Sequence, residues 1–236
     1  GKQVATYIPE QWYEYADYKS RYWAPLPEID YSEYGIGRLD LMRLDPVSKM
    51  SLVAAAQALD DAGITARPLD RRQSIFELAG IHPERSGVIL GTGIGGVNTT
   101  AVSHTTHLFA RHRRDIENIL DTEELNASVA AELHRILKTM DYPERYNPFA
   151  VSMIMNNSIS ANIGIRYRCK GLNESISVAC ASGTVALGAA FEAIQRGELD
   201  LAVSGGAEYK YDSTGCAFWA YDVAGTLAHD FPTPQE

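Results

Sequence analysis

A strand–helix–strand pattern in the C-terminal third of the chain restricts the possible folds more than any other feature of the sequence. Residues 176–180 form a short, mostly apolar run, residues 184–197 have the composition of a helix, and residues 199–204 form a second apolar run. Small residues follow both runs, at 181–183 and 205–207. Strands that alternate with helices predict an α/β protein with a central, largely buried sheet.

The preceding residues extend this alternation. A third apolar run, at 87–90, leads into the glycine-rich residues 91–96. Pro46 suits the first position of a helix, and Gly63 suits its end. A further helix is expected over 152–165, where Met, Asn and Ser are frequent.

The remaining segments carry weaker signals, and none of them reads as a linker between domains. Residues 1–45 are rich in Tyr, Trp and Pro and predict an irregular segment. The sequence predicts a polar connection at residues 65–85 and two polar helices at residues 105–146. We therefore expect one α/β domain over 46–236, with an inserted helical segment at about 105–146.

Composition excludes several classes of protein. The 236-residue chain has a net charge of -9 and no long basic block, which argues against nucleic-acid binding. No run of 18 apolar residues or secretory leader is visible, so no membrane span is expected. Three cysteines, an odd number, argue against a disulfide framework, and we expect a cytoplasmic protein.

Cys180 is the candidate nucleophile. It lies where a strand is expected to lead into a helix, and a helix N-terminus favours the thiolate, the reactive form of cysteine. The small residues around it, 179–183, leave room for a thioester, and their backbone N–H groups could bind an oxyanion. These features predict acyl transfer. The alternative is a small buried hydrophobic side chain, which we expect for Cys169 and Cys216.

Three other patterns are weaker. Residues 91–96 match G-x-G-x-x-G, but no strand ending in an acid follows at the required distance, so a tight turn is favoured over a dinucleotide site. His104, His107 and His112 lack cysteine or well-spaced carboxylate partners, so no metal site is expected. Residues 111–114 are basic and read as a solvated face, with docking of an acidic partner as the alternative.

Several motifs occur together in one order over about residues 40–236: 54–63, 91–96, Pro148-Phe149, 170–183 and 202–208. In this combination the sequence resembles a β-ketoacyl-acyl-carrier-protein synthase, a ketosynthase of the thiolase superfamily. The resemblance implies the N-terminal half of a thiolase-like, layered α/β/α fold with a mixed central sheet flanked by helices.

The resemblance also implies a reaction and a set of site residues. A cysteine takes an acyl group from the phosphopantetheine of an acyl carrier protein, and a malonyl-type extender then loses carbon dioxide and condenses with it, in fatty-acid or polyketide biosynthesis. Cys180 matches that cysteine, Ile94 would line the acyl pocket, and Phe218 or Trp219 would lie near its mouth or wall. Ala150 would enter the pocket from the second subunit of a dimer. No cofactor or metal is expected to bind directly.

The resemblance has limits. The family's two catalytic histidines, a lysine and the second oxyanion donor belong to a C-terminal half that this sequence lacks, so we expect the fragment alone to be inactive. The expanded segment 105–146 indicates a polyketide-type or otherwise specialised enzyme. Two alternatives stay open: a thiolase-like acyltransferase without decarboxylation, and a non-catalytic partner subunit of a ketosynthase heterodimer.

Overall fold

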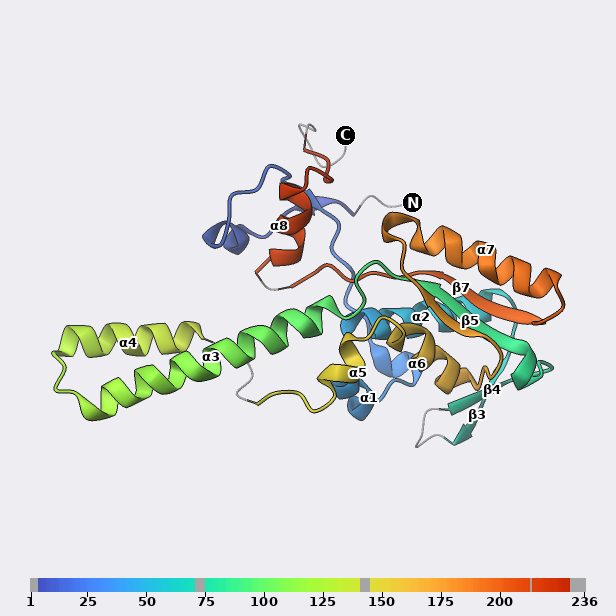
Figure 1. Cartoon of the computed structure of the whole chain (residues 1–236), viewed down its shortest axis with the longest axis horizontal. Coiled ribbons are helices and arrows are strands. Elements are labelled where there is room, and N and C mark those ends of the chain that lie inside the picture. The colour runs from blue at the N-terminus through green and yellow to red at the C-terminus, as the bar shows by residue number, and fades with distance from the viewer. Residues whose placement is uncertain (1–3, 71–74, 141–144, 213, 230–236) are drawn as a thin grey trace.

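A three-stranded parallel sheet forms the centre of the described structure (Figure 1). The computed structural model describes residues 4–70, 75–140, 145–212 and 214–229. Strand β5 (Ser86–Gly91) lies in the middle, with β6 (Asn173–Ile176) on one side and β7 (Leu201–Gly206) on the other. Both neighbours run parallel to β5, so all three carboxyl ends meet at one edge of the sheet.

Helices cover both faces of this sheet. Every residue of β5 is buried, and neighbouring side chains of a strand point to opposite faces. Leu90 packs in a cluster with residues of α2 (Pro46–Asp61) and α6 (Ser158–Tyr167), whereas Ile89 packs against α7 (Ser182–Gln195). Figure 1 shows α7 on one side of the sheet and α2 and α6 on the other. The expected α/β/α layering is therefore present, with a central sheet that is parallel throughout its described strands.

The start of α2 follows the sequence prediction and also holds the next helix in place. Asp45 is the N-cap, and Pro46 occupies the first helical position. The buried Asp45 carboxylate accepts hydrogen bonds from Val47 N at 2.9 Å and from Thr99 N and Oγ1 at 2.9 and 2.6 Å. It thereby joins α2 to α3 (Val97–Thr122).

Two expectations about local structure were wrong. The supposed polar connection at 65–85 contains an antiparallel hairpin of β3 (Ala66–Asp70) and β4 (Ile75–Leu78), followed by a 3-10 turn. Leu78 is buried in the α2–α6 cluster, which explains why this short strand forms. The helix expected over 152–165 is divided into α5 (Ala150–Ile154) and α6, and Gly96 N donates to the Ile154 carbonyl beside the break.

The N-terminal segment is more ordered than its composition predicted. It contains two short antiparallel strands, β1 (Thr6–Tyr7) and β2 (Tyr22–Trp23), two 3-10 turns, and α1 (Arg38–Arg43). Trp12 is buried, with its ring centroid 5.5 Å from that of Phe218 in α8 (Cys216–Val223). This aromatic contact ties the beginning of the described chain to its end.

Helices α3 and α4 (Ala127–Thr139) form the predicted helical hairpin, which projects from the body in Figure 1. The first helix begins earlier than expected, directly after the glycine-rich turn. Only Thr99, Ser103 and Thr106, near its base, are buried. In the part of the chain that the structure describes, no helix is long and apolar enough to cross a membrane.

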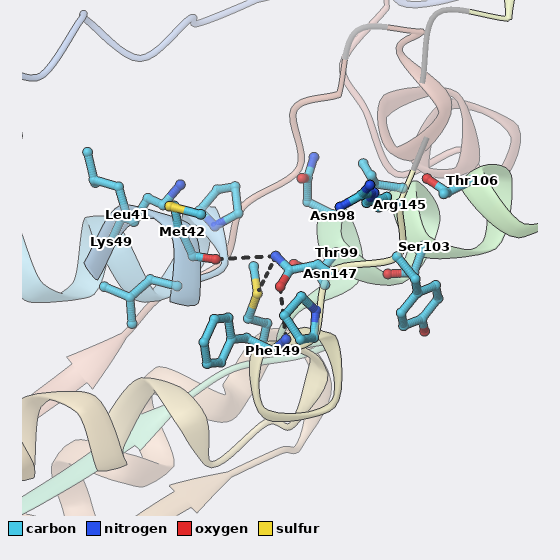
Figure 2. Close-up of a pocket in the computed structure, with 16 residues that line it drawn as sticks. Leu41, Met42, Lys49, Asn98, Thr99, Ser103, Thr106, Arg145, Asn147 and Phe149 are labelled. Carbon is cyan, nitrogen blue, oxygen red and sulfur yellow. Dashed lines mark hydrogen bonds between the residues drawn. The ribbon is translucent and has the colours of Figure 1, made fainter. Parts of the chain in front are cut away.

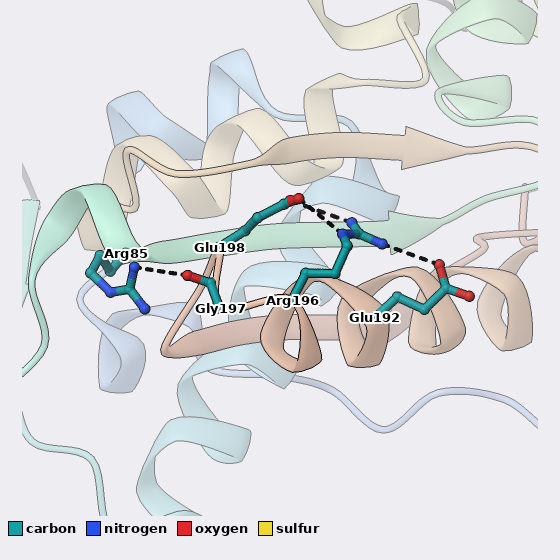
Figure 3. Close-up of polar contacts among 5 residues, drawn as sticks. All are labelled: Arg85, Glu192, Arg196, Gly197 and Glu198. Carbon is teal, nitrogen blue, oxygen red and sulfur yellow. Dashed lines mark hydrogen bonds and ion pairs between the residues drawn. The ribbon is translucent and has the colours of Figure 1, made fainter.

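Ion pairs surround the turn between α7 and β7, at the edge opposite the carboxyl ends of the strands (Figure 3). Arg85 Nη1 donates to Gly197 O at 3.0 Å, and its guanidinium pairs with Asp200 at 2.5 and 2.6 Å. Arg196 bonds Glu192 and Glu198. These side chains are exposed, so they contribute little to stability and mainly fix the path of the turn.

Candidate active site

Three loops meet where the parallel strands end: residues 92–96 after β5, 177–181 after β6 and 207–208 after β7. Ser177 Oγ donates to Gly93 O at 3.1 Å, which joins the first two loops. The Glu208 carboxylate accepts from Gly93 N at 2.7 Å and from Ile94 N at 3.1 Å, which joins the third. Open α/β sheets bind their ligands at this edge.

Cys180 is exposed between these loops and α7. It lies in one turn of 3-10 helix, Ala179–Ala181, rather than at the end of a strand, because β6 stops at Ile176. Ala179 has a φ of +50°, which is uncommon for a residue with a Cβ and marks local strain. Within the described chain the Cys180 thiol has no hydrogen-bond or ionic partner. The thiol is thus presented on a sharp, strained turn.

A single hydroxyl holds this turn together. Ser182 Oγ accepts from Val178 N, on the residue before the strained Ala179, at 2.9 Å and donates to the carbonyl of Ala179 itself at 2.7 Å. Ser182 is buried and is also the first residue of α7. The same side chain therefore fixes both the loop before Cys180 and the start of the helix after it.

Glycines allow α7 to begin directly against the strand ends. A Cβ on Gly91 would overlap the Ser182 carbonyl and lie 2.5 Å from Gly183 N. A Cβ on Gly206 would lie 3.0 Å from Gly183 Cα. The N-terminus of α7 therefore sits against the carboxyl edge of the sheet, and the positive end of its dipole lies next to Cys180.

The other two cysteines differ from each other. Cys169 is buried, as expected, and burial raises the pKa of its thiol. Cys216 was also expected to be buried, and this was wrong: it is exposed at the start of α8. Helix α8 turns Phe218 toward the N-terminal aromatic residues, which leaves Cys216 on the solvent side.

The structure separates the four predicted pocket residues. Ile94 is 48% exposed in the loop that contacts Ser177 and Glu208. Phe218 and Glu208 line one cavity of about 680 Å³, and Trp219 is exposed outside that lining. Ala150 has no exposed surface in the single chain and lies at the start of α5. Only Ile94 is therefore placed in the loops next to Cys180.

Sequence reasoning missed the side chains that assemble the site. Ser177 and Glu208 received no role, and Ser182 was considered only as one of the small residues that leave room around Cys180. The acid after Gly205-Gly206-Ala207 was the most visible signal, because a carboxylate at a strand end readily caps backbone N–H groups. Among the described residues, no group of three or more His, Cys, Asp or Glu side chains could hold a metal.

Comparison with known families identifies the chain. The family model for the beta-ketoacyl synthase N-terminal domain matches residues 1–230. The chain belongs to the β-ketoacyl synthase family.

A 3-oxoacyl-[acyl-carrier-protein] synthase 2 of Staphylococcus aureus is 27% identical over 173 residues, covering 73% of this chain and 32% of the relative. The Vibrio harveyi protein of the same name is 25% identical, covering 93% and 42%. The chain thus spans less than half the length of these relatives.

Solved structures agree on the fold. A beta-ketoacyl synthase from Burkholderia phymatum STM815 has a TM-score of 0.60 and 22% identity, over 98% of this chain and 45% of that one. The ishigamide ketosynthase/chain length factor has a TM-score of 0.54 and 19% identity, over 97% and 49%. A type II polyketide ketosynthase in complex with its acyl-carrier protein, AntDE:AntF, has a TM-score of 0.52 and 19% identity, over 86% and 45%. The thiolase-like ketosynthase fold is thereby confirmed.

Proposed function

We propose that this chain supplies the nucleophile of a carrier-protein-dependent ketosynthase. The observation that supports this most strongly is the exposed Cys180 on a strained turn between a parallel strand and a helix N-terminus, in a member of the β-ketoacyl synthase family. Two of the similar proteins, a 3-oxoacyl-[acyl-carrier-protein] synthase 2 and a ketosynthase in complex with its acyl-carrier protein, support a carrier-bound substrate. In this proposal no cofactor binds the chain directly.

The reaction has two steps. The Cys180 thiolate attacks the thioester carbonyl of an acyl carrier, forms an acyl-cysteine and releases the carrier thiol. A malonyl-type carrier thioester then loses carbon dioxide, and its enolate carbon attacks the acyl-cysteine, forming a carbon–carbon bond and releasing the Cys180 thiolate. Backbone N–H groups near the start of α7, that of Cys180 included, would stabilise the oxyanion in both steps.

The decarboxylation step depends on groups other than Cys180. We propose that two histidines outside this sequence stabilise the enolate, so that the 236 residues alone would accept an acyl group but not complete the condensation. We also propose that Ile94, Ala150, Phe218 and Trp219 line the acyl pocket of a dimer. The Ala150 side chain is buried within one chain. Ala150 would therefore shape the acyl pocket by fixing the position of α5, and its own side chain would not be exposed in the pocket.

Substitution of the exposed cysteines tests the proposal. Intact protein carrying Cys180→Ala should accept no acyl group from an acyl-carrier thioester, as measured by protein mass spectrometry. Cys216→Ala is the matched control, since that cysteine is also exposed, and it should be acylated at the wild-type rate. Acylation of Cys180→Ala would refute the role of Cys180. In a protein that also contains the two proposed histidines, acylation without a β-ketoacyl product, when the malonyl carrier is added, would instead favour a non-decarboxylating acyltransferase.

A further inference from the structure

A cavity with aromatic walls lies between the N-terminal segment, the first half of α2, the residues that follow β7, and α8. Its volume of about 680 Å³ is within the range of sites that bind small molecules. Cys180 does not line it. Six aromatic side chains do: Trp12, Trp23, Tyr31, Tyr209, Tyr211 and Phe218. Such walls suit a flat aromatic ligand.

One polar atom of this wall lacks a hydrogen-bond partner. Trp12 is 1% exposed, and its Nε1 is the one buried side-chain nitrogen or oxygen without a partner among the residues that the structure describes. Trp23, in the same wall, differs, because its Nε1 donates to Tyr7 O at 3.1 Å. Buried N–H groups normally have an acceptor, and leaving one unsatisfied costs free energy. The Trp12 indole therefore points to an acceptor that a ligand supplies.

Packing around Trp12 indicates the side from which this acceptor comes. A Cβ on Gly215 would lie 2.5 Å from Cδ2 and 2.7 Å from Cε3 of the indole, and Gly215 does not line the cavity. Nε1 belongs to the opposite long edge of the ring. Trp23 and Phe218, which do line the cavity, hold the indole in place at centroid distances of 5.2 and 5.5 Å. We therefore expect the acceptor on the cavity side of Trp12.

A second cavity, between α1, the base of α3 and the segment before α5, differs in this respect (Figure 2). Asn147 Nδ2 donates to Met42 O at 3.2 Å and to Met153 Sδ at 3.4 Å. Its Oδ1 accepts from Phe149 N at 2.9 Å. The dashed lines in Figure 2 mark these bonds. The chain itself satisfies that amide, whereas it leaves the Trp12 indole without an acceptor.

The charged side chains of the aromatic cavity favour a neutral ligand. Glu28 and Glu208 both line it and would repel an anion. Lys210 also lines it, but its Nζ lies 3.9 Å from the centroid of the Tyr221 ring and is engaged there. A cation offers no acceptor to the Trp12 N–H group. A neutral ligand with an oxygen acceptor meets all of these conditions.

We propose that this cavity binds a neutral, flat aromatic molecule that carries a carbonyl oxygen. The carbonyl accepts a hydrogen bond from Trp12 Nε1, and the ring lies against the aromatic walls. The inference does not rest on the proposed acyl transfer, because Cys180 takes no part in the site.

Indole N–H NMR of the intact chain, isotope-labelled at its tryptophan nitrogens, tests the proposal with α-tetralone as the probe. The Trp12 signal should move downfield in a saturable way because its N–H group gains an acceptor, while Trp219, outside the lining, stays unchanged. Tetralin has the same skeleton without the carbonyl and should bind about tenfold more weakly, a difference of about 1.4 kcal/mol. Absence of the Trp12 shift, or equal affinity for tetralin, would overturn the proposal. So would tighter binding of trimethylphenylammonium, which would assign the cavity to a cation.

Matched variants locate the ligand. Trp12→Phe keeps an aromatic ring without the N–H group, and it should lower the affinity for α-tetralone about tenfold while leaving that for tetralin nearly unchanged. Tyr211 is exposed, so Tyr211→Ala should fold even if Trp12→Phe does not, and it should weaken both ligands at least about threefold. Tyr15→Ala, at an exposed position of the N-terminal segment outside the lining, should bind both like the wild type.

Two results with these variants would contradict the assignment. One is wild-type affinity for α-tetralone in folded Trp12→Phe, and the other is equal affinity in Tyr211→Ala and Tyr15→Ala. Cys180→Ala should bind α-tetralone normally, which separates this test from that of acyl transfer.

Discussion

At the scale of single residues, the Ser182 hydroxyl determines the shape of the turn that presents Cys180. We expect Ser182→Ala to lower the free energy of unfolding by about 1–3 kcal/mol, because Val178 N and Ala179 O lose their shared partner. We also expect slower acylation of Cys180, by roughly tenfold or more, because a displaced nucleophile loses its alignment. Urea titration and acylation kinetics measure the two effects.

Thr184, two residues further along α7, provides the control for Ser182. Thr184→Ala also removes a hydroxyl from the first turns of α7, but this side chain is exposed and forms no hydrogen bond with the described residues. Both the stability and the acylation rate should stay close to wild type. If Ser182→Ala acylated as fast as Thr184→Ala, the turn would not depend on the Ser182 hydroxyl.

The three cysteines should react with iodoacetamide in a defined order. Cys180 should be modified first, because it is exposed beside the N-terminus of α7. Cys216 should react second, because at the N-terminus of α8 the Asp212 carboxylate already accepts hydrogen bonds from Cys216 N and Ala217 N. Cys169 should react last, since burial both blocks access and raises the pKa of its thiol. Peptide mapping over time measures the order, and all three should react alike after denaturation. Equal rates for Cys180 and Cys216 in the folded chain would instead fit a non-catalytic subunit.

At the scale of secondary-structure elements, close packing between β5 and α7 positions the site. Gly91→Ala should destabilise the chain by roughly 3 kcal/mol, because the new methyl group meets the backbone of Ser182 and Gly183, which cannot move aside cheaply. Gly188 lies in α7, and a new methyl group there would have open space around it. Gly188→Ala should therefore stabilise the chain by about 1 kcal/mol. Thermal unfolding distinguishes the two; a stabilising Gly91→Ala would contradict the packing described.

The helices and strands that could be predicted from sequence are those whose ends are marked by their own residues. Helix α2 begins at Pro46 as expected, since a Pro at the first position and an Asp cap are local features. The hairpin of β3 and β4 was missed because its burial comes from contact with α6, a partner distant in sequence. The division between α5 and α6 depends in the same way on the loop that contains Gly96.

The candidate site likewise contains one residue that its local sequence identifies and others that only tertiary contacts place. Cys180 was identified from its immediate neighbours and is exposed where expected, although β6 ends four residues before it. Glu208 could not be assigned, because its bonds to Gly93 and Ile94 cross 115 and 114 residues of sequence. The exposure of Cys216 likewise follows from how α8 packs on the N-terminal segment. Positions of this kind depend on tertiary contacts that no local pattern contains.

At the scale of the whole molecule, one face of α7 exposes more apolar surface than a folded chain normally leaves in water. Leu187, Phe191 and Ile194, at helical spacing, are 55%, 66% and 44% exposed. We expect the chain on its own to bind a hydrophobic dye and to self-associate. Leu187→Lys with Phe191→Lys should reduce both effects while leaving the urea midpoint nearly unchanged, because neither side chain is buried.

An exposed apolar side chain on a different helix provides the comparison for this face. Leu39 on α1 is 73% exposed, and Leu39→Lys should leave dye binding and self-association unaltered. Dye fluorescence and sedimentation velocity measure both properties. Undiminished dye binding in the α7 double variant would show that the exposed surface lies elsewhere in the molecule.

Mapping the site of acylation decides whether Cys180 carries the acyl chain. The intact chain is incubated with an acyl-carrier thioester, digested, and analysed by mass spectrometry of its peptides. We predict one acyl group per chain, on the peptide that contains Cys180. An acyl group on the Cys216 peptide instead, or an unmodified Cys180 peptide after prolonged incubation, would contradict it.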